Sequence, residues 1–226
     1  MNYDNIKKGR FLNRPNRFIA QVEIDGEEHT VHVKNTGRCK EILVPNAEVF
    51  LEKSSNPLRK TQYDLIAVYK GKTLVNMDSQ TPNKVVFEWL KAGGLLKNPT
   101  FIKPETKYGD SRLDFYLENE DEKMFLEVKG VTLEIDGTAK FPDAPTERGR
   151  KHLGELIKAK QNGYRSAVIF VVQMKGCKCF MPNNENDPEF AKELKRAYES
   201  GVEIIAVDCI VTPDSMTIDK RIEVSL

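Results

Sequence analysis

Hydrophobic and polar positions follow two different patterns along the 226 residues of the chain, and the change comes near residue 82. Up to that point, short apolar stretches of period two are separated by turns, as in half-buried strands. Beyond it, apolar positions recur every three or four residues and two continuous apolar runs occur, as in amphipathic helices and buried central strands. We therefore predict two domains, covering residues 1–82 and 83–226.

The N-terminal part contains strand candidates and no convincing helix pattern. Turns at Asp25-Gly26 and Lys70-Gly71-Lys72 indicate two hairpins. The strand candidates are residues 18–24, 30–33, 47–51, 63–69 and 73–76. Short strands in such a row predict a small Greek-key barrel, and an OB-like β-barrel is the version that we expect.

The C-terminal part alternates between helix and strand patterns. Gly93-Gly94 is expected to close the first helix, Thr146 is expected to cap the second, and Asp187-Pro188 is expected to open the third. The expected helices are residues 83–96, 146–163 and 187–201, and the expected strands are residues 112–117, 124–129, 166–174 and 202–209. This order predicts a mixed sheet with flanking helices, so the whole chain is of the α/β (α+β) class.

Composition excludes several classes of protein. With 39% hydrophobic and 31% charged residues and no apolar run of membrane-spanning length, we expect a soluble protein that does not enter a membrane. The chain shows no signal-peptide pattern, and its four cysteines suggest no disulfide framework, which favours a cytoplasmic location. The net charge of +1 excludes a generally basic protein that coats nucleic acid.

Any contact with nucleic acid must therefore be local, and one basic cluster stands out. Lys7, Lys8, Arg10, Arg14 and Arg17 fall within eleven residues that contain no acidic residue. Such a cluster attracts phosphate groups. On charge alone, however, an ordinary solvated surface explains it at least as well.

Two strands at residues 112–117 and 124–129 form the most informative segment. A turn centred between Glu120 and Asp121 places apolar residues opposite each other along one whole face. The paired residues are Leu113 with Val128, Phe115 with Leu126, and Leu117 with Met124.

The opposite face of this predicted hairpin carries charged residues. Asp114 lies across from Glu127, and alternation puts Lys129 on the same side as Glu127. Two neighbouring carboxylates repel each other unless a cation lies between them. We therefore predict a site for Mg²⁺ or Mn²⁺, which Glu88 on the preceding helix completes. Lys129 would position the attacking water or contact a phosphate oxygen.

A Glu–Lys pair on a hairpin is more often an ordinary solvated face than a site. The next segment favours a site, because it gathers cations at the start of a helix, whose free N–H groups bind phosphate. These cations are Arg148, Arg150, Lys151 and His152.

The spacing Asp-(x)n-Glu-x-Lys resembles the PD-(D/E)XK nuclease superfamily, whose core residues Asp114, Glu127 and Lys129 match. Glu88 matches the helix carboxylate that many members use, whereas Leu113 replaces the proline of the motif. A tighter resemblance, to the sugar fermentation stimulation protein A (SfsA) family, covers nearly the whole chain. It rests on separate motifs in the right order, at residues 14–18, 32–38, 111–115, 126–133 and 141–153.

The resemblance implies an N-terminal OB-like domain, a C-terminal restriction-endonuclease-like domain, and DNA as the partner. It also implies regulation of sugar-utilisation genes, the role described for family members. Arg38 is expected either to contact phosphate or to brace the domain interface. Together with the charge pattern, the expected DNA contacts are Arg10, Arg14, Arg17, Arg38, Arg148, Lys151 and His152.

Three functions remain open at this point. The first is a DNA-binding phosphodiesterase that depends on Mg²⁺ or Mn²⁺. The second is a DNA-binding regulator that keeps a nuclease fold without turnover. The third is a sensor that binds a sugar or a nucleotide in the cleft between the domains. The sequence also leaves open whether the chain forms a homodimer.

Further residues carry expectations of their own. Gln173, near the end of a predicted strand, is placed to reach the metal site or a phosphate. Gly37 is expected to adopt a positive φ in a turn. Phe87 is expected in the core rather than as a base-stacking side chain. Phe11 and Phe18, which lie among arginines, are better candidates for base stacking, although a barrel core would bury Phe18 first.

Overall fold

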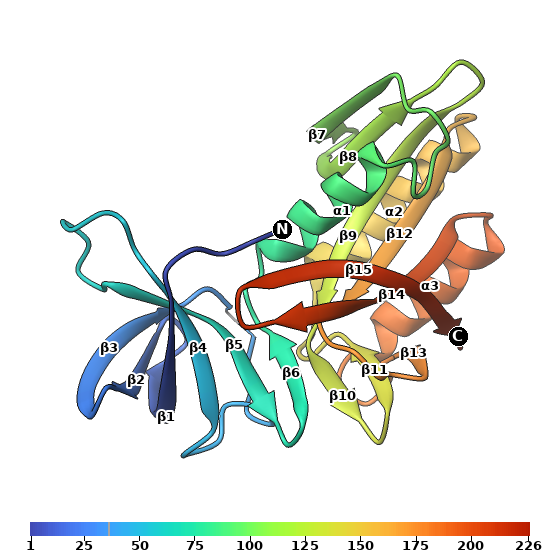
Figure 1. Cartoon of the computed structure of the whole chain (residues 1–226). Coiled ribbons are helices and arrows are strands. Elements are labelled where there is room, and N and C mark those ends of the chain that lie inside the picture. Colours follow the sequence, from blue (N-terminus) through green and yellow to red (C-terminus); the bar gives the residue numbers. More distant parts are fainter. Residues whose placement is uncertain (36) are drawn as a thin grey trace.

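The computed structural model describes residues 1–35 and 37–226, so Thr36 of the second family-like motif lies outside the described residues. A barrel of N-terminal strands lies beside a long mixed sheet that is covered by helices (Figure 1). The last strand beside the barrel ends at Asn76, and helix α1 (Thr81–Lys91) begins the second unit. The predicted α/β class is confirmed.

The N-terminal strands form a closed barrel. They are β1 (Ile6–Asn16), β2 (Ile19–Ile24), β3 (Glu27–Val33), β4 (Glu48–Lys53) and β5 (Tyr63–Lys70), with β6 (Thr73–Asn76) beside β5. They pair in the order β3-β2-β1-β4-β5, and a parallel pairing of β3 with β5 closes the ring. The predicted OB-like barrel is therefore confirmed.

Strand β1 is the barrel strand that the hydrophobic pattern does not reveal. Most of its residues are charged or polar, and Phe11 is its fully buried residue (2% exposed). The strand nevertheless pairs with both β2 and β4. Backbone hydrogen bonds and the buried Phe11 side chain thus hold the strand in place, and most of the basic cluster at residues 7–17 lies along it.

The C-terminal sheet has the strand order β10-β11-β13-β15-β14-β12-β9-β8-β7. Its strands are β7 (Phe101–Tyr108), β8 (Ser111–Glu118), β9 (Lys123–Val131), β10 (Leu133–Ile135), β11 (Thr138–Phe141), β12 (Arg165–Val172), β13 (Cys179–Pro182), β14 (Glu203–Thr212) and β15 (Ser215–Val224). Helix α1 packs on one face, and α2 (Glu147–Gln161) and α3 (Pro188–Glu199) pack on the other (Figure 1). This is the predicted mixed sheet with flanking helices.

Helix ends follow the capping signals in the sequence. Thr146 accepts a hydrogen bond from the Gly149 N–H (3.0 Å), and Asp187 accepts one from the Phe190 N–H (2.9 Å). Helix α1 ends at Lys91, just before the Gly93-Gly94 pair that the sequence predicts as its end, and Gly93 takes a φ of 80° that turns the chain away. No helix in the described ranges is both long and apolar enough to span a membrane.

Buried polar contacts join the two units. Gln173 is 1% exposed, and its Nε2 donates to the carbonyl and side-chain oxygens of Asn76 (3.1 and 3.0 Å) and to the carbonyl of Asp78 (3.1 Å). The apolar core of the barrel is also continuous with that under α2 and α3. The side-chain amide N–H groups of Gln173 therefore donate at the junction of the two units and not to a metal ligand or a phosphate.

Candidate metal and phosphate site

Strands β8 and β9 pair along part of their length and then separate. Their ladder ends at Phe115 and Leu126, in the register that the sequence predicts. Beyond that point β9 continues beside β12, and β8 continues beside β7. The two strands therefore form a fork, and the next residue on each strand is a carboxylate, Asp114 or Glu127.

Asp114 is held in the fork by two hydrogen bonds. Its Oδ2 accepts from the backbone N–H of Val128 (2.8 Å), and its Oδ1 accepts from the side-chain amide of Asn83 on α1 (2.8 Å). Burial raises the pKa of the Asp114 carboxyl, and the negative charge of Glu127 raises it further. The two acids are thus close enough to repel each other, which is the repulsion that a cation relieves.

Glu127 is almost fully buried, with 2% of its surface exposed. Its Oε1 accepts from the Lys129 ammonium (2.5 Å) and from Nδ1 of His152 on α2. Burial raises the pKa of the Glu127 carboxyl, but the His152 hydrogen bond and the Lys129 charge outweigh burial and hold that pKa below its ordinary value. Among the described residues, nothing donates to its buried Oε2.

His152 occupies a different place from the one that the sequence suggests. It is expected to contact DNA, but it is 5% exposed and lies between Glu127 and Arg148. The Arg148 Nε atom is 3.4 Å from His152 Nε2 and can act only as a donor, so the ring hydrogen sits on Nδ1 and points to Glu127. His152 therefore orients a carboxylate and is not available to phosphate.

Glu88 does not join the two carboxylates of the fork. It is exposed and pairs with the N-terminal ammonium of Met1 at 2.6 Å. An α-helix turns about 100° per residue, so Asn83 and Glu88, five positions apart, lie on different sides of α1. Asn83 is the α1 residue that reaches Asp114, and nothing in the local pattern marks it out.

The donor set in the fork suits a hard divalent cation. Mg²⁺ takes one or two carboxylates and completes its octahedron with water and phosphate oxygens. Asp114 and Glu127 supply two such groups, and the fold leaves Oε2 of Glu127 unsatisfied. Across residues 1–35 and 37–226, no three or more His, Cys, Asp or Glu side chains gather around one metal position. A cation here would take its remaining ligands from water and substrate.

Two of the expected DNA contacts are engaged within the barrel. The guanidinium of Arg14 donates to the backbone carbonyls of Arg17, Asn35, Gly37 and Arg38. Arg10 donates to Glu23 (2.6 Å) and to Asn46 (2.7 Å). Arg14 therefore braces a loop instead of facing phosphate, and the charge of Arg10 is already paired with an acid.

The loop that Arg14 braces meets the C-terminal unit at Asp143. The backbone N–H of Arg38 donates to Asp143 Oδ2 at 3.1 Å. Gly37 is not among the positive-φ residues, contrary to expectation. A Cβ atom at Gly37 would lie 2.5 Å from Asp143 Oδ2, so close approach is what requires glycine there. The loop thus lies against the segment that leads into α2.

The other expected contacts present their side chains to solvent. They are Arg17, Arg38, Arg148 and Lys151. The Lys151 ammonium donates to the carbonyl of Asp110 (2.9 Å), so one of its hydrogens is engaged, and none of the described acidic side chains pairs with its charge. Arg17 lies 5.9 Å from the ring centre of Phe18, which is 52% exposed and therefore outside the barrel core. Both units thus contribute exposed cations.

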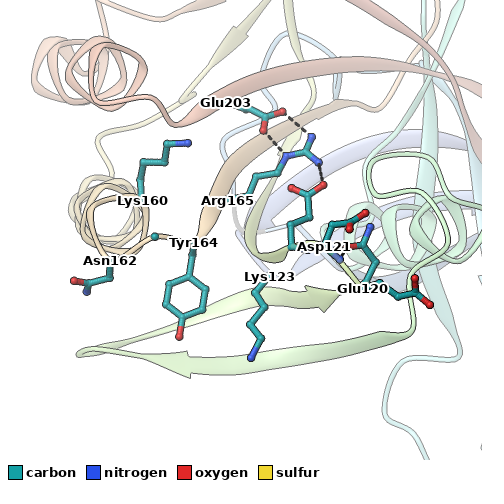
Figure 2. Close-up of a pocket in the computed structure, with 11 residues that line it drawn as sticks. Glu120, Asp121, Lys123, Lys160, Asn162, Tyr164, Arg165 and Glu203 are labelled. Atoms are coloured by element: carbon teal, nitrogen blue, oxygen red, sulfur yellow. Dashed lines mark hydrogen bonds and ion pairs between the residues drawn. The ribbon is translucent and has the colours of Figure 1, made fainter.

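A cavity of about 720 Å³ lies away from the fork, at the end of α2 and the start of β12 (Figure 2). Its Arg165 pairs with Glu203 (2.5 Å) and with Glu122 (3.2 Å), so these charges already satisfy one another. None of the residues expected in the functional site lines this cavity. The fork is therefore the better candidate for chemistry.

The chain matches two family models along most of its length. Residues 12–77 match the SfsA N-terminal OB domain, and residues 80–215 match the sugar fermentation stimulation protein RE domain. The chain belongs to the SfsA family.

Relatives of this SfsA-family chain share its full length. A sugar fermentation stimulation protein homolog of Clostridium beijerinckii is 59% identical and one of Ruminiclostridium cellulolyticum is 53% identical, each over 100% of both chains. The solved structure of Pyrococcus furiosus SfsA in complex with Ca²⁺ matches with a TM-score of 0.90 at 28% identity, over 100% of this chain and 98% of that one. The two-part architecture is thus that of the SfsA family.

Proposed function

We propose that this SfsA-family protein binds DNA and hydrolyses its phosphodiester bonds with Mg²⁺ or Mn²⁺ held by Asp114 and Glu127. The observation that carries the proposal is the buried Oε2 of Glu127, which has no partner among the described residues, in a fork that also holds Asp114. An unsatisfied buried oxygen costs about 1–3 kcal/mol, and a bound cation removes that cost. The Ca²⁺ complex of the Pyrococcus furiosus relative supports a cation in this family.

The residues around the fork have separate roles. The cation, when bound, polarises a phosphate oxygen and lowers the pKa of a coordinated water. Lys129, whose side chain is 15% exposed, orients the attacking water or meets a phosphate oxygen. His152 holds Glu127 in position, and Asn83 holds Asp114.

Exposed cations on both units would guide the DNA backbone to the fork. Arg38 comes from the barrel loop that rests on Asp143, and Arg148 and Lys151 come from the first turns of α2. Arg17 extends the set along the barrel. Such contacts go to phosphates, so binding should weaken as salt rises and should show little base preference.

Labelled single- and double-stranded DNA, incubated with Mg²⁺, Mn²⁺ or EDTA, tests this proposal. We expect metal-dependent cleavage by the wild type and cleavage slower by about a hundredfold or more in Glu127→Gln, with DNA binding retained. Glu88→Gln is the matched control, because this carboxylate is exposed and paired with Met1 outside the fork. A wild type that cuts neither DNA with either metal rejects hydrolysis.

A DNA-binding regulator without turnover is the second candidate. The family description, stimulation of sugar fermentation, favours it. So does the small number of protein donors that the described residues bring to the fork. In this case the wild type and Glu127→Gln would bind DNA alike, with the same salt dependence, and neither would cut it.

A further inference from the structure

A pocket of about 340 Å³ adjoins Asp114 on the side of the fork that faces α1. Residues of α1, β7 and β8 line it. Besides Asp114, the lining residues are Asn83, Lys84, Phe87, Pro104, Glu105 and Phe115. The pocket therefore shares one carboxylate with the proposed metal site, and whatever enters it comes close to that site.

Two aromatic side chains, Phe87 and Phe115, are among the residues that line this pocket. They are stacked on each other, with ring planes that differ by 7° and centres 6.0 Å apart. Phe115 is buried (2% exposed), whereas Phe87 is partly exposed. The Lys91 ammonium lies 4.2 Å from the centre of the Phe87 ring, but Lys91 does not line the pocket. Phe87 is thus the aromatic ring of the pocket that a ligand can reach.

Charged residues also line the pocket. Lys84 is exposed, and none of the described acidic groups pairs with it. Glu105 has its carboxylate 3.4 Å from the guanidinium of Arg112, which offsets its charge. The Lys84 ammonium is therefore available to an anion in a pocket that Asp114 also lines.

We propose that this pocket receives the unpaired base of the nucleotide next to the phosphate at the fork, with Lys84 on a neighbouring phosphate. The inference rests on the proposed function and adds to it a substrate class, DNA that is single-stranded or locally opened. A base inside a duplex is stacked and paired, and it must leave the stack to enter a side pocket. Stacking on the ring of Phe87 accepts every base, so the sequence preference is weak.

Fluorescence of 2-aminopurine tests the pocket without cleavage. Short oligonucleotides that carry this base are bound to the wild-type protein in EDTA. We expect stacking to quench the emission of the single strand and not of the duplex. Phe87→Leu, which keeps an apolar side chain against Phe115, should relieve the quenching and weaken binding by about tenfold. Phe101→Leu, at an exposed aromatic residue on β7 outside the pocket, should behave as the wild type.

A cleavage assay separates this inference from the proposed function. In a wild type that cuts DNA, an abasic nucleotide beside the cleaved phosphate should slow cleavage by about tenfold. In Phe87→Leu the same abasic nucleotide should have little further effect, because both changes remove one contact. Base binding in the pocket is rejected if the wild type and Phe87→Leu quench the emission equally. It is also rejected if the effects of Phe87→Leu and of the abasic nucleotide on the cleavage rate are additive. Neither result speaks against hydrolysis at the fork. If the quenching depends on Phe87 but the wild type cleaves no DNA, hydrolysis is rejected and base binding in the pocket is supported.

Discussion

The Nδ1 atom of His152 and the Oε1 atom of Glu127 form a buried hydrogen bond that ties α2 to the fork between β8 and β9. Arg148 donates to the other ring nitrogen, which fixes the tautomer of the imidazole. Lys129 contacts the same carboxylate oxygen as His152 does. The second oxygen of Glu127 is thereby held in one orientation, and that orientation depends on a residue 25 positions away in sequence.

Replacing His152 should therefore weaken metal binding more than DNA binding. We expect His152→Ala to lower the affinity for Mn²⁺ by about ten- to a hundredfold, because a residue that positions a metal ligand has been lost. Calorimetric titration with Mn²⁺ measures this directly. His152→Asn, which keeps a donor near the position of Nδ1, should recover part of the affinity. Unchanged Mn²⁺ affinity in His152→Ala would show that His152 serves packing alone.

Replacing Asp114 should stabilise the metal-free protein. Burial and the charge of Glu127 raise the pKa of Asp114 in the folded state. Its contribution to the free energy of unfolding is therefore favourable below its unfolded pKa and is lost as the pH rises through the folded pKa. At neutral pH the ionised Asp114 carboxylate therefore destabilises the metal-free folded protein. Asp114→Asn should raise the Tm in EDTA at pH 7 by roughly 2–4 °C per kcal/mol relieved, with Asn83 turning its amide to accept.

The gain from Asp114→Asn should shrink as the pH falls through the raised pKa of Asp114, where the wild-type carboxyl takes up its proton. Asp110→Asn is the control, since Asp110 is exposed on the turn before β8. A Tm that falls in Asp114→Asn at neutral pH would contradict this prediction.

Replacing Arg14 should lower stability, whereas replacing Arg38 should weaken DNA binding, although the sequence predicts both residues as DNA contacts. Arg14→Ala removes the donors to the loop carbonyls and should cost about 2 kcal/mol or more of unfolding free energy. Arg38→Ala keeps the backbone bond to Asp143 and removes an exposed cation. It should leave stability nearly unchanged and reduce the salt slope of DNA binding by about 1. Urea unfolding and salt-dependent binding measure the two effects, and a reversed pattern would refute both assignments.

The ionised Asp64 carboxylate should stabilise the folded protein, and this stabilisation should be lost at acid pH. Burial raises its pKa, but the hydrogen bond from Arg59, the charge of Lys34 and the bond to His32 outweigh burial and lower the pKa to about 2. The stabilisation is present above the unfolded pKa of 3.8 and is lost as the pH falls through about 2. We expect Asp64→Asn to cost about 2 kcal/mol at neutral pH, and this difference should narrow below about pH 4. A difference that stays constant down to pH 3 in denaturant titrations would argue against it.

Local patterns were sufficient to predict the parts of the fold that depend on neighbours in sequence. The register of β8 with β9 follows from apolar partners such as Phe115 and Leu126, because a shift by one residue would expose every one of them. Thr146 and Asp187 act as helix caps because their side chains reach N–H groups three residues later. The strand β1 lacks such a pattern, because most of its side chains are charged or polar and Phe11 is its buried residue.

Long-range geometry decides the parts of the candidate site that the sequence does not reveal. Glu88 and Asn83 both fit the helical pattern of α1, and the packing of Val85, Val86 and Leu90 on the sheet sets which side faces the fork. His152 precedes Leu153 on α2, and its burial depends on the depth at which that helix sits on β9. An arginine such as Arg14 looks the same in sequence whether it meets phosphates or carbonyls.

The amide of Gln173 bonds to Asn76 and Asp78, which lie inside the protein between the barrel and α1. A shortened chain that ends after the barrel would turn these groups, and the apolar surface around them, toward water. The isolated halves should therefore be poorly soluble reagents, and a missing activity in one of them would say little about the intact protein. Fragment studies and domain exchanges with other proteins should carry residues 76–81 together with β12 and Gln173.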